Sequence, residues 1–245
     1  MVGGQARKPC GGAPALFFSH HPQTAHPLPL HLPVNSIAWA PPELGLHLAC
    51  ASSDGYVSVL SHRVEDNGWD VHRGMHCPSG AMAVSWAPGS SAQPMLATAG
   101  CDGSVRVWVG RVAGGGGSGG GGGGAQLAWD AAAAKVLQVG SSGGAEWARD
   151  VAWCPAGVPL EGGGVGQLLA ACSDGGRVLL WRSSDGFAAP AALPPFGHPV
   201  WRLSWSPTGR LLAVTCGDNS VTLWKEDVAG TWMSVCNAPV NVDVQ

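Results

Sequence analysis

Hydrophobic and polar positions along this chain follow a two-part pattern that recurs four times. Each first part alternates apolar residues with small or polar ones, a period of two that is typical of a half-buried β-strand, and it contains a tryptophan near its end. Each second part begins with a short apolar run bounded by turn residues, which predicts a strand buried on both faces. The first parts are NSIAWAP from Asn35, AMAVSWAP from Ala81, RDVAWCP from Arg149 and WRLSWSP from Trp201, and the second parts begin at Leu48, Leu96, Leu169 and Leu212.

An aspartate turn and two further strands complete each repeat. Asp-Gly strongly favours a β-hairpin, and it follows the apolar run in three repeats, while Asp-Asn takes its place in the last. A third strand follows each turn, and a tryptophan marks an outer fourth strand in three of the repeats. The turns are Asp54-Gly55, Asp102-Gly103, Asp174-Gly175 and Asp218-Asn219, and the outer tryptophans are Trp69, Trp129 and Trp232.

The spacing of the repeats predicts the architecture. The tryptophans of the four first parts are 47, 67 and 52 residues apart, which fits a propeller blade of about 40–45 residues with insertions added. We therefore predict an all-β, partial β-propeller over 34–240, with these tryptophans on the innermost strands. Trp147 and Trp201 share strand parity with the tryptophans that follow them and are expected to extend the inner strands. The blades are predicted at 34–76, 80–140, 146–196 and 198–240, and the inner-strand tryptophans are Trp39, Trp86, Trp153 and Trp205.

Three segments interrupt the repeats. Residues 1–33 hold six prolines and no strand alternation, so we expect them to be disordered. The run 114–124 is glycine except for Ser118, and it should form a flexible loop insertion between the third and outer strands of the second repeat. The stretch 157–166 should lengthen the loop between the first two strands of the third repeat.

Composition excludes several classes of partner and site. Only 12% of the residues are charged and the formal net charge is −3, so we expect no nucleic-acid partner. No apolar stretch approaches the roughly 18 residues of a membrane span, and we expect no direct membrane insertion. The eight cysteines form no C-x-x-C pair and are interpreted as structural thiols of a reducing compartment, rather than as disulfides or a zinc site. The nine histidines lack fixed ligand spacing, so we predict neither a metal nor a cofactor.

Two G-x-S-x-G strings, around Ser118 and Ser142, are the sequence features that could suggest catalysis. A nucleophile elbow requires a strand entering the turn and a helix leaving it. Ser118 lies inside the glycine run and Ser142 lies in GSSGG before a strand, so chance matches in Gly/Ser-rich sequence explain both. No Gly-Lys-Ser/Thr follows any glycine cluster, which argues against a phosphate-binding loop. We predict that the chain is not an enzyme.

Longer phrases of the repeats resemble one family, the small WD-repeat propellers of the COPII outer coat (the Sec-thirteen family). The resemblance covers residues 34–236, and WAPPELGLHLACASSDG and GDNSVTLWKE are its most distinctive phrases. The family has six blades in one chain, forming an open propeller that accepts a seventh blade from a partner. This sequence resembles the third to sixth blades, and a shortened gene model is preferred over a divergent isoform. The apolar face near Ile37 and Trp39 is therefore expected to lack a neighbour.

The chain also departs from the family pattern. Trp108, Trp181 and Trp224 precede Val, Arg and Lys, so the usual WD dipeptide is absent. One Gly-His pair is present, Gly197-His198. We therefore expect the hydrogen-bond set that stabilises blades of this family to be incomplete.

The resemblance implies a non-enzymatic scaffold subunit of the COPII outer coat and of the nuclear pore scaffold. Its implied locations are the cytoplasmic face of the endoplasmic reticulum, COPII vesicles bound for the Golgi, and the nuclear pore complex. Its implied partners are the large outer-coat subunit, by blade insertion, and the nucleoporins of the nuclear pore Y-complex. A complex upstream of the TOR kinase is a further implied partner. The alternative from another class is a generic WD-repeat adaptor that recruits substrates to a ubiquitin ligase.

By resemblance, the partner's blade sits beside the last blade of this chain. An open propeller leaves unpaired backbone at its gap, and an added strand gains main-chain hydrogen bonds there. The competing interpretation is that the tryptophans of the last blade are ordinary blade core. The candidate interface residues are Trp201, Trp205, Trp224 and Trp232.

Overall fold

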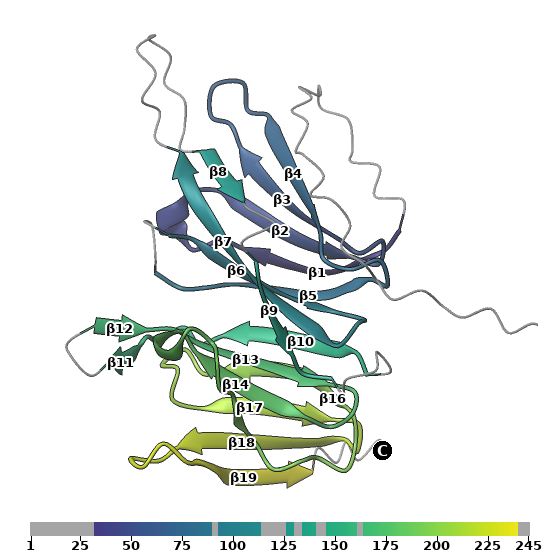
Figure 1. Cartoon of the computed structure of the whole chain (residues 1–245), viewed down its shortest axis with the longest axis vertical. Coiled ribbons are helices and arrows are strands. Elements are labelled where there is room, and N and C mark those ends of the chain that lie inside the picture. The colour runs from purple at the N-terminus through teal and green to yellow at the C-terminus, as the bar shows by residue number, and fades with distance from the viewer. Residues whose placement is uncertain are drawn as a thin grey trace, which may run out of the picture.

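The computed structural model describes residues 32–89, 93–113, 126–129, 134–140, 146–160 and 164–239. Four antiparallel sheets follow one another in chain order, from β1–β4 at one end of the molecule to β16–β19 at the other (Figure 1). We call these sheets blades 1 to 4. The predicted all-β architecture of antiparallel blades is confirmed, and within the described residues blades 1, 3 and 4 have four strands and blade 2 has five.

In each blade a strand pairs with the next strand of the blade, except that blade 2 has a fifth strand, which pairs with its third. Blade 1 consists of β1 (Val34–Trp39), β2 (His47–Ser52), β3 (Tyr56–His62) and β4 (Trp69–Met75). Blade 2 consists of β5 (Ala81–Trp86), β6 (Met95–Gly100) and β7 (Ser104–Ala113), with β8 (Gln126–Trp129) and β9 (Lys135–Gln138) both paired to β7. Blade 3 consists of β10 (Ala148–Trp153), β13 (Leu168–Ser173), β14 (Val178–Arg182) and β15 (Ala191–Ala192). Blade 4 consists of β16 (Val200–Trp205), β17 (Leu212–Cys216), β18 (Ser220–Glu226) and β19 (Trp232–Pro239). In the part of the chain that the structure describes, two short 3-10 turns, η1 (Pro42–Leu44) and η3 (Ser183–Asp185), lie between strands.

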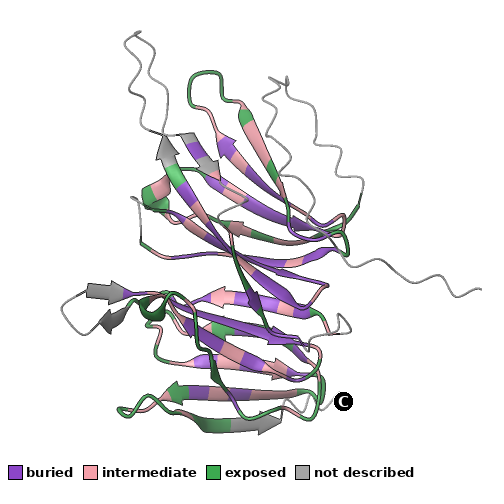
Figure 2. Cartoon of the chain, in the orientation of Figure 1, coloured by how far each residue is buried: buried purple, intermediate pink, exposed green. Residues whose placement is uncertain are grey.

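The hydrophobic core lies in the seams between successive blades, where buried positions concentrate (Figure 2). In each seam, one blade contributes small and β-branched residues, such as Ala97 and Val107 of blade 2. The next blade contributes a tryptophan-rich face, such as Trp153 and Trp181 of blade 3. A sheet buried on both sides explains why the second-strand segments are runs of apolar residues rather than alternating ones.

The four first-part tryptophans occupy equivalent places at the ends of the innermost strands, as predicted. Each pairs with a leucine of the second strand, which in turn pairs with a large residue of the third. This register places the tryptophan, the leucine and the third-strand residue on one side of the blade. The rows are Trp39, Leu48 and Leu60; Trp86, Leu96 and Trp108; Trp153, Leu169 and Trp181; and Trp205, Leu212 and Trp224.

The prediction that Trp147 and Trp201 extend the inner strands in unbroken parity holds only in part. Register shifts interrupt the start of β10 between Ala148 and Asp150, and the start of β16 between Val200 and Arg202. A bulge adds one residue and breaks the alternation of side chains. Trp201 extends the inner strand of blade 4, since it lies in β16, but the bulge interrupts its parity with Trp205 and it is 45% exposed. Trp147 lies before β10 and does not extend that strand.

The aspartate turns place one residue in the left-handed region, which glycine and asparagine tolerate. Gly55 has a φ of +84° and Asn219 a φ of +62°. In blade 3 this residue is Gly176, with a φ of +79°, so Gly175 does not have the role that the sequence suggested. Three of the aspartates accept a 3.0 Å hydrogen bond at Oδ1 from the backbone N–H two residues later, namely Asp54, Asp102 and Asp218.

The stretch 157–166 is more ordered than a lengthened loop. Its described parts form a small hairpin of β11 (Val158–Leu160) and β12 (Gly164–Gly166). Backbone pairing of this kind is not visible in a glycine-rich sequence without hydrophobic alternation. The glycine run 114–124 and the Pro-rich segment, apart from its last two residues, lie outside the described residues.

The expectation of an incomplete hydrogen-bond set is wrong for blade 2. Trp108 Nε1 donates to Thr98 Oγ1 over 2.8 Å, and Thr98 Oγ1 lies 2.6 Å from His76 Nδ1. His76 Nε2 lies 3.2 Å from Ser104 Oγ, which donates to Asp102 Oδ1 over 2.7 Å. Met75 rather than a glycine precedes this histidine, so no Gly-His pair marks it in the sequence. The network links His76, in the segment between β4 and β5, to β6 and β7 of blade 2.

Candidate functional site

Blade 1 carries an apolar face that the described residues leave uncovered. Ile37 is 61% exposed and Trp39 is 58% exposed. The neighbouring Ala38 points the other way and packs against the core of the seam with blade 2. At the position of Ile37, the other blades place Val84, Val151 and Leu203, none of which exceeds 7% exposure. The expected lack of a neighbour near Ile37 and Trp39 therefore agrees with their exposure.

Blade 4 carries the second uncovered face, on its side away from blade 3. Leu223 pairs with Ala213 there, and both are only partly buried. Their counterparts in blade 3 are Leu180 and Ala170, which are at most 1% exposed. In β19, Met233 is 53% exposed. The two uncovered faces thus belong to the first and last blades, at opposite ends of the molecule (Figure 1).

Three of the four candidate interface tryptophans pack toward blade 3 rather than on the open face. Trp224 is buried in the seam of blades 3 and 4, and Trp205 and Trp232 pack against the same cluster. Trp205 Nε1 donates to the carbonyl of Ala152 over 3.1 Å, and its ring meets that of Trp232 edge-on at 5.8 Å. These side chains can support the open face from behind, and any contact with a partner stays a prediction.

Trp201 has a different environment, which the sequence pattern did not indicate. The guanidinium of Arg149 lies 4.7 Å from the ring centre of Trp147 and 4.8 Å from that of Trp201. Arg149 also pairs with Asp174 over 3.4 Å. This cation–π arrangement holds the two partly exposed tryptophans beside the starts of β10 and β16. The structure therefore separates Trp201 from the other three candidates.

A cluster of His76, Cys77 and Asp102 brings three possible metal ligands within 4.8 Å of one another. Both ring nitrogens of His76 already lie at hydrogen-bond distance from hydroxyl groups, and Cys77 Sγ donates to the carbonyl of Gly80 over 3.2 Å. Burial lowers the pKa of His76. Burial alone would raise the pKa of Asp102, but hydrogen bonds with His76 and Ser104 hold it well below its usual range. These bonds account for the cluster as part of the blade network.

Acidification is expected to weaken this network. The folded state holds His76 with a pKa below the ordinary 6.5, so the stability that the neutral ring contributes is present above pH 6.5 and is lost as pH falls below it. Asp102 contributes stability that is lost only as the pH falls to and below its ordinary pKa of 3.8. We expect the thermal midpoint to drop by about 5 °C between pH 7.5 and 5.5.

Thermal melts followed by circular dichroism test this expectation. His76→Gln removes the titrating ring and should flatten the slope in that window, although the variant is less stable throughout. His47, whose pKa burial also lowers, keeps part of the slope. An equal slope in the two proteins would contradict the assignment to His76.

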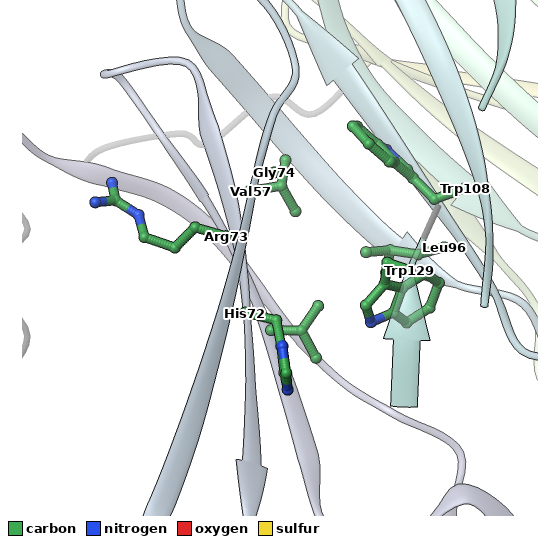
Figure 3. A pocket seen from close by; sticks show the side chains of 8 residues that line it. Val57, His72, Arg73, Gly74, Leu96, Trp108 and Trp129 are labelled. Atoms are coloured by element: carbon green, nitrogen blue, oxygen red, sulfur yellow. The ribbon is translucent and has the colours of Figure 1, made fainter. Parts of the chain in front are cut away.

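A small apolar pocket lies between blades 1 and 2 (Figure 3). Val57, Val59 and Gly74 line it from blade 1, and Trp108 and Trp129 line it from blade 2. The pocket continues the seam between the blades and brings together no nucleophile and base. Ser118 and Ser142, the serines of the two G-x-S-x-G strings, lie outside the described residues.

The described cysteines are free thiols, and six of the seven are buried. Cys50, Cys172 and Cys216 lie in second strands, as the sequence indicated. Burial raises the pKa of the Cys172 thiol well above its ordinary value, which keeps it protonated and unreactive. Within the described part of the chain, no helix has the length and apolar character needed to cross a membrane.

Known proteins that resemble this chain share its repeats. The family model described as "WD domain, G-beta repeat" matches residues 72–109 and 193–225. The chain is 38% identical to "Protein transport protein SEC13" of Mycosarcoma maydis, over 82% of this chain and 59% of the relative. It is 34% identical to "Protein SEC13 homolog" of Drosophila melanogaster, over 82% of this chain and 54% of the relative.

A third relative gives the same result. The chain is 36% identical to "Protein transport protein sec13" of Emericella nidulans, over 82% of this chain and 62% of the relative. The chain therefore spans 54–62% of the length of these three relatives. The matched share of this chain and the four-stranded WD-type blades agree with the resemblance read from the sequence. Over most of its length the chain is thus similar to proteins named SEC13, and two of its segments match the WD repeat.

Proposed function

We propose that the chain is a non-enzymatic scaffold in protein transport. Two of the relatives named above are called protein transport proteins, which supports the coarse assignment. The observation that carries the proposal in the structure is the open face of blade 4, where Ala213 and Leu223 repeat the residue types of covered blade faces. A scaffold needs such a surface for a partner and needs no reactive group.

The proposed partner is the large outer-coat subunit of COPII, which would insert a blade beside blade 4. The chain would then act on the cytoplasmic face of the endoplasmic reticulum and on COPII vesicles. Nuclear pore Y-complex nucleoporins and a complex upstream of the TOR kinase are further proposed partners on the same resemblance. A blade docked on an open sheet face gains apolar burial, and its edge strand gains main-chain hydrogen bonds.

Affinity purification with a charge placed on the open face tests this proposal. Tagged chain is expected to recover outer-coat or pore-scaffold subunits from cell extract. Leu223→Glu should reduce that recovery about tenfold or more, because a carboxylate would be buried against the inserted blade. The control is Val64→Glu, at a turn position that is 83% exposed. Recovery of cullin-ligase components instead would support the adaptor alternative and refute the scaffold.

Trp201→Ala tests the remaining candidate on its own. Trp201 is exposed and contacts Arg149 of blade 3, outside the buried cluster that holds Trp224 and against which Trp205 and Trp232 pack. If the partner contacts this region, the substitution should weaken recovery several-fold while the circular dichroism spectrum stays unchanged. Unchanged recovery by a folded variant would remove Trp201 from the interface.

A further inference from the structure

The two uncovered faces of this chain are of opposite and matching types. The side of each blade that receives the preceding blade carries the row of tryptophan, leucine and large third-strand residue, and in blade 1 this row is Trp39, Leu48 and Leu60. The other side carries a small residue before the tryptophan, an alanine on the second strand and Val or Leu on the third. In blade 4 this second row is Ser204, Ala213 and Leu223.

The second row is repeated in the blades whose corresponding face is covered. Its members are Ala38, Ala49 and Val59 in blade 1, Ser85, Ala97 and Val107 in blade 2, and Ala152, Ala170 and Leu180 in blade 3. Every one of the three internal seams joins such a row to the tryptophan row of the next blade. The last blade thus offers the surface that the first blade's open face is shaped to receive.

Indole hydrogen bonds cross two of the three seams in the same way, whereas in the seam of blades 2 and 3 it is the backbone N–H of Trp153 that donates, to Ser85 Oγ. Trp86 Nε1 donates to the carbonyl of Ala38 over 3.0 Å, and Trp205 Nε1 donates to the carbonyl of Ala152 over 3.1 Å. In both seams, the acceptor is the residue just before the inner tryptophan of the preceding blade. Trp39 has no such acceptor among the described residues. The equivalent carbonyl at the other end of the molecule belongs to Ser204.

We propose that the open face of blade 1 binds the open face of blade 4 of a second copy of this chain, so that copies join head to tail. The contact repeats the internal seams, with Ile37 and Trp39 packed on Ala213 and Leu223 and the indole of Trp39 donating to Ser204. Two copies hold eight blades, which lies within the range of about four to eight that propellers use. A head-to-tail contact can close into a ring when its rotation allows.

This inference uses only surfaces of the chain and does not rest on the proposed function. It does place the second copy on the blade 4 face that a partner's blade would occupy. Self-association would therefore compete with partner binding. A chain without its partner would still have its apolar faces covered, by other copies of the chain. A concentrated stock should accordingly bind a partner's blade more slowly than a dilute one.

Complementary blocking variants test the head-to-tail contact. Ile37→Glu places a charge on the blade 1 face and Leu223→Glu places one on the blade 4 face. By light scattering after size exclusion, the wild-type chain should form dimers or longer oligomers that dissociate on dilution. Each variant alone should stay monomeric, and an equimolar mixture should form one-to-one dimers through the single intact pair of faces. Val64→Glu should associate as the wild type does.

Three results would overturn the proposal. The first is a wild-type chain that remains monomeric at all concentrations, and the second is a Leu223→Glu variant that associates as well as wild type. The third is a mixture of folded blocking variants that stays monomeric. If either variant fails to fold, hydrogen exchange on the wild type decides. Peptides of β1 and β18 should both gain protection at high concentration, and protection of only one would refute the contact.

Discussion

Purified chain 1–245 is expected not to behave as a monodisperse monomer, and fusing two preceding blades of a SEC13 relative to its N-terminal side should rescue it. The reason is the face that carries Ile37 and Trp39, which are 61% and 58% exposed. Covering roughly 400 Å² of apolar surface contributes on the order of 10 kcal/mol at about 25 cal/mol per Å². This gain is as large as the net stability of a whole domain, about 5–15 kcal/mol.

The rescue is measured as a rise of about 20 °C or more in the thermal midpoint, together with loss of self-association. The matched control carries the same fusion on the Ile37→Glu chain, where a buried carboxylate should oppose docking of the added blades. A sharp and reversible transition from monomeric wild-type chain would show that four blades stand alone. Equal stabilisation of the Ile37→Glu fusion would show that the added blades act elsewhere.

Replacing Gly55 by alanine is expected to destabilise the chain by about 3–5 kcal/mol. A Cβ at this position would lie 1.8 Å from the backbone oxygen of Cys77, and the residue has a φ of +84°. The left-handed conformation alone costs a non-glycine residue about 1–2 kcal/mol. The overlap with a backbone atom adds to that, because no side-chain rotation can relieve it.

Gly89→Ala is the matched control for this prediction. Gly89 also has a left-handed φ, +67°, but a Cβ there meets nothing within 4 Å. Its substitution should therefore cost about 1–2 kcal/mol, the conformational part alone. Urea unfolding of both variants at one protein concentration measures the difference, in the blade fusion if the chain alone does not unfold cooperatively. Equal midpoints would mean that the turn can move away from Cys77.

The hydrogen-bond network of blade 2 shows how local sequence signals can fail. The sequence contains one Gly-His pair, Gly197-His198, yet it is His76 that completes a network with Thr98 and Trp108. The role of His76 in the network depends on its position beside Thr98 of β6. A dipeptide motif carries no information about that position. Bulges at the starts of β10 and β16 likewise interrupt the side-chain alternation on which the prediction for Trp147 and Trp201 depended.

The sequence by itself determined the repeat, the all-β class and the place of the inner tryptophans, because the period and the hydrophobic alternation are local properties of the chain. It also indicated that Ile37 and Trp39 would lack a neighbour. Only the tertiary structure decided which side of blade 4 carries its tryptophans. Trp205 and Trp224 face the seam with blade 3, and Ala213 and Leu223 form the open face. The alternation of a strand shows that two sides exist, whereas the packing of the next sheet decides which one is covered.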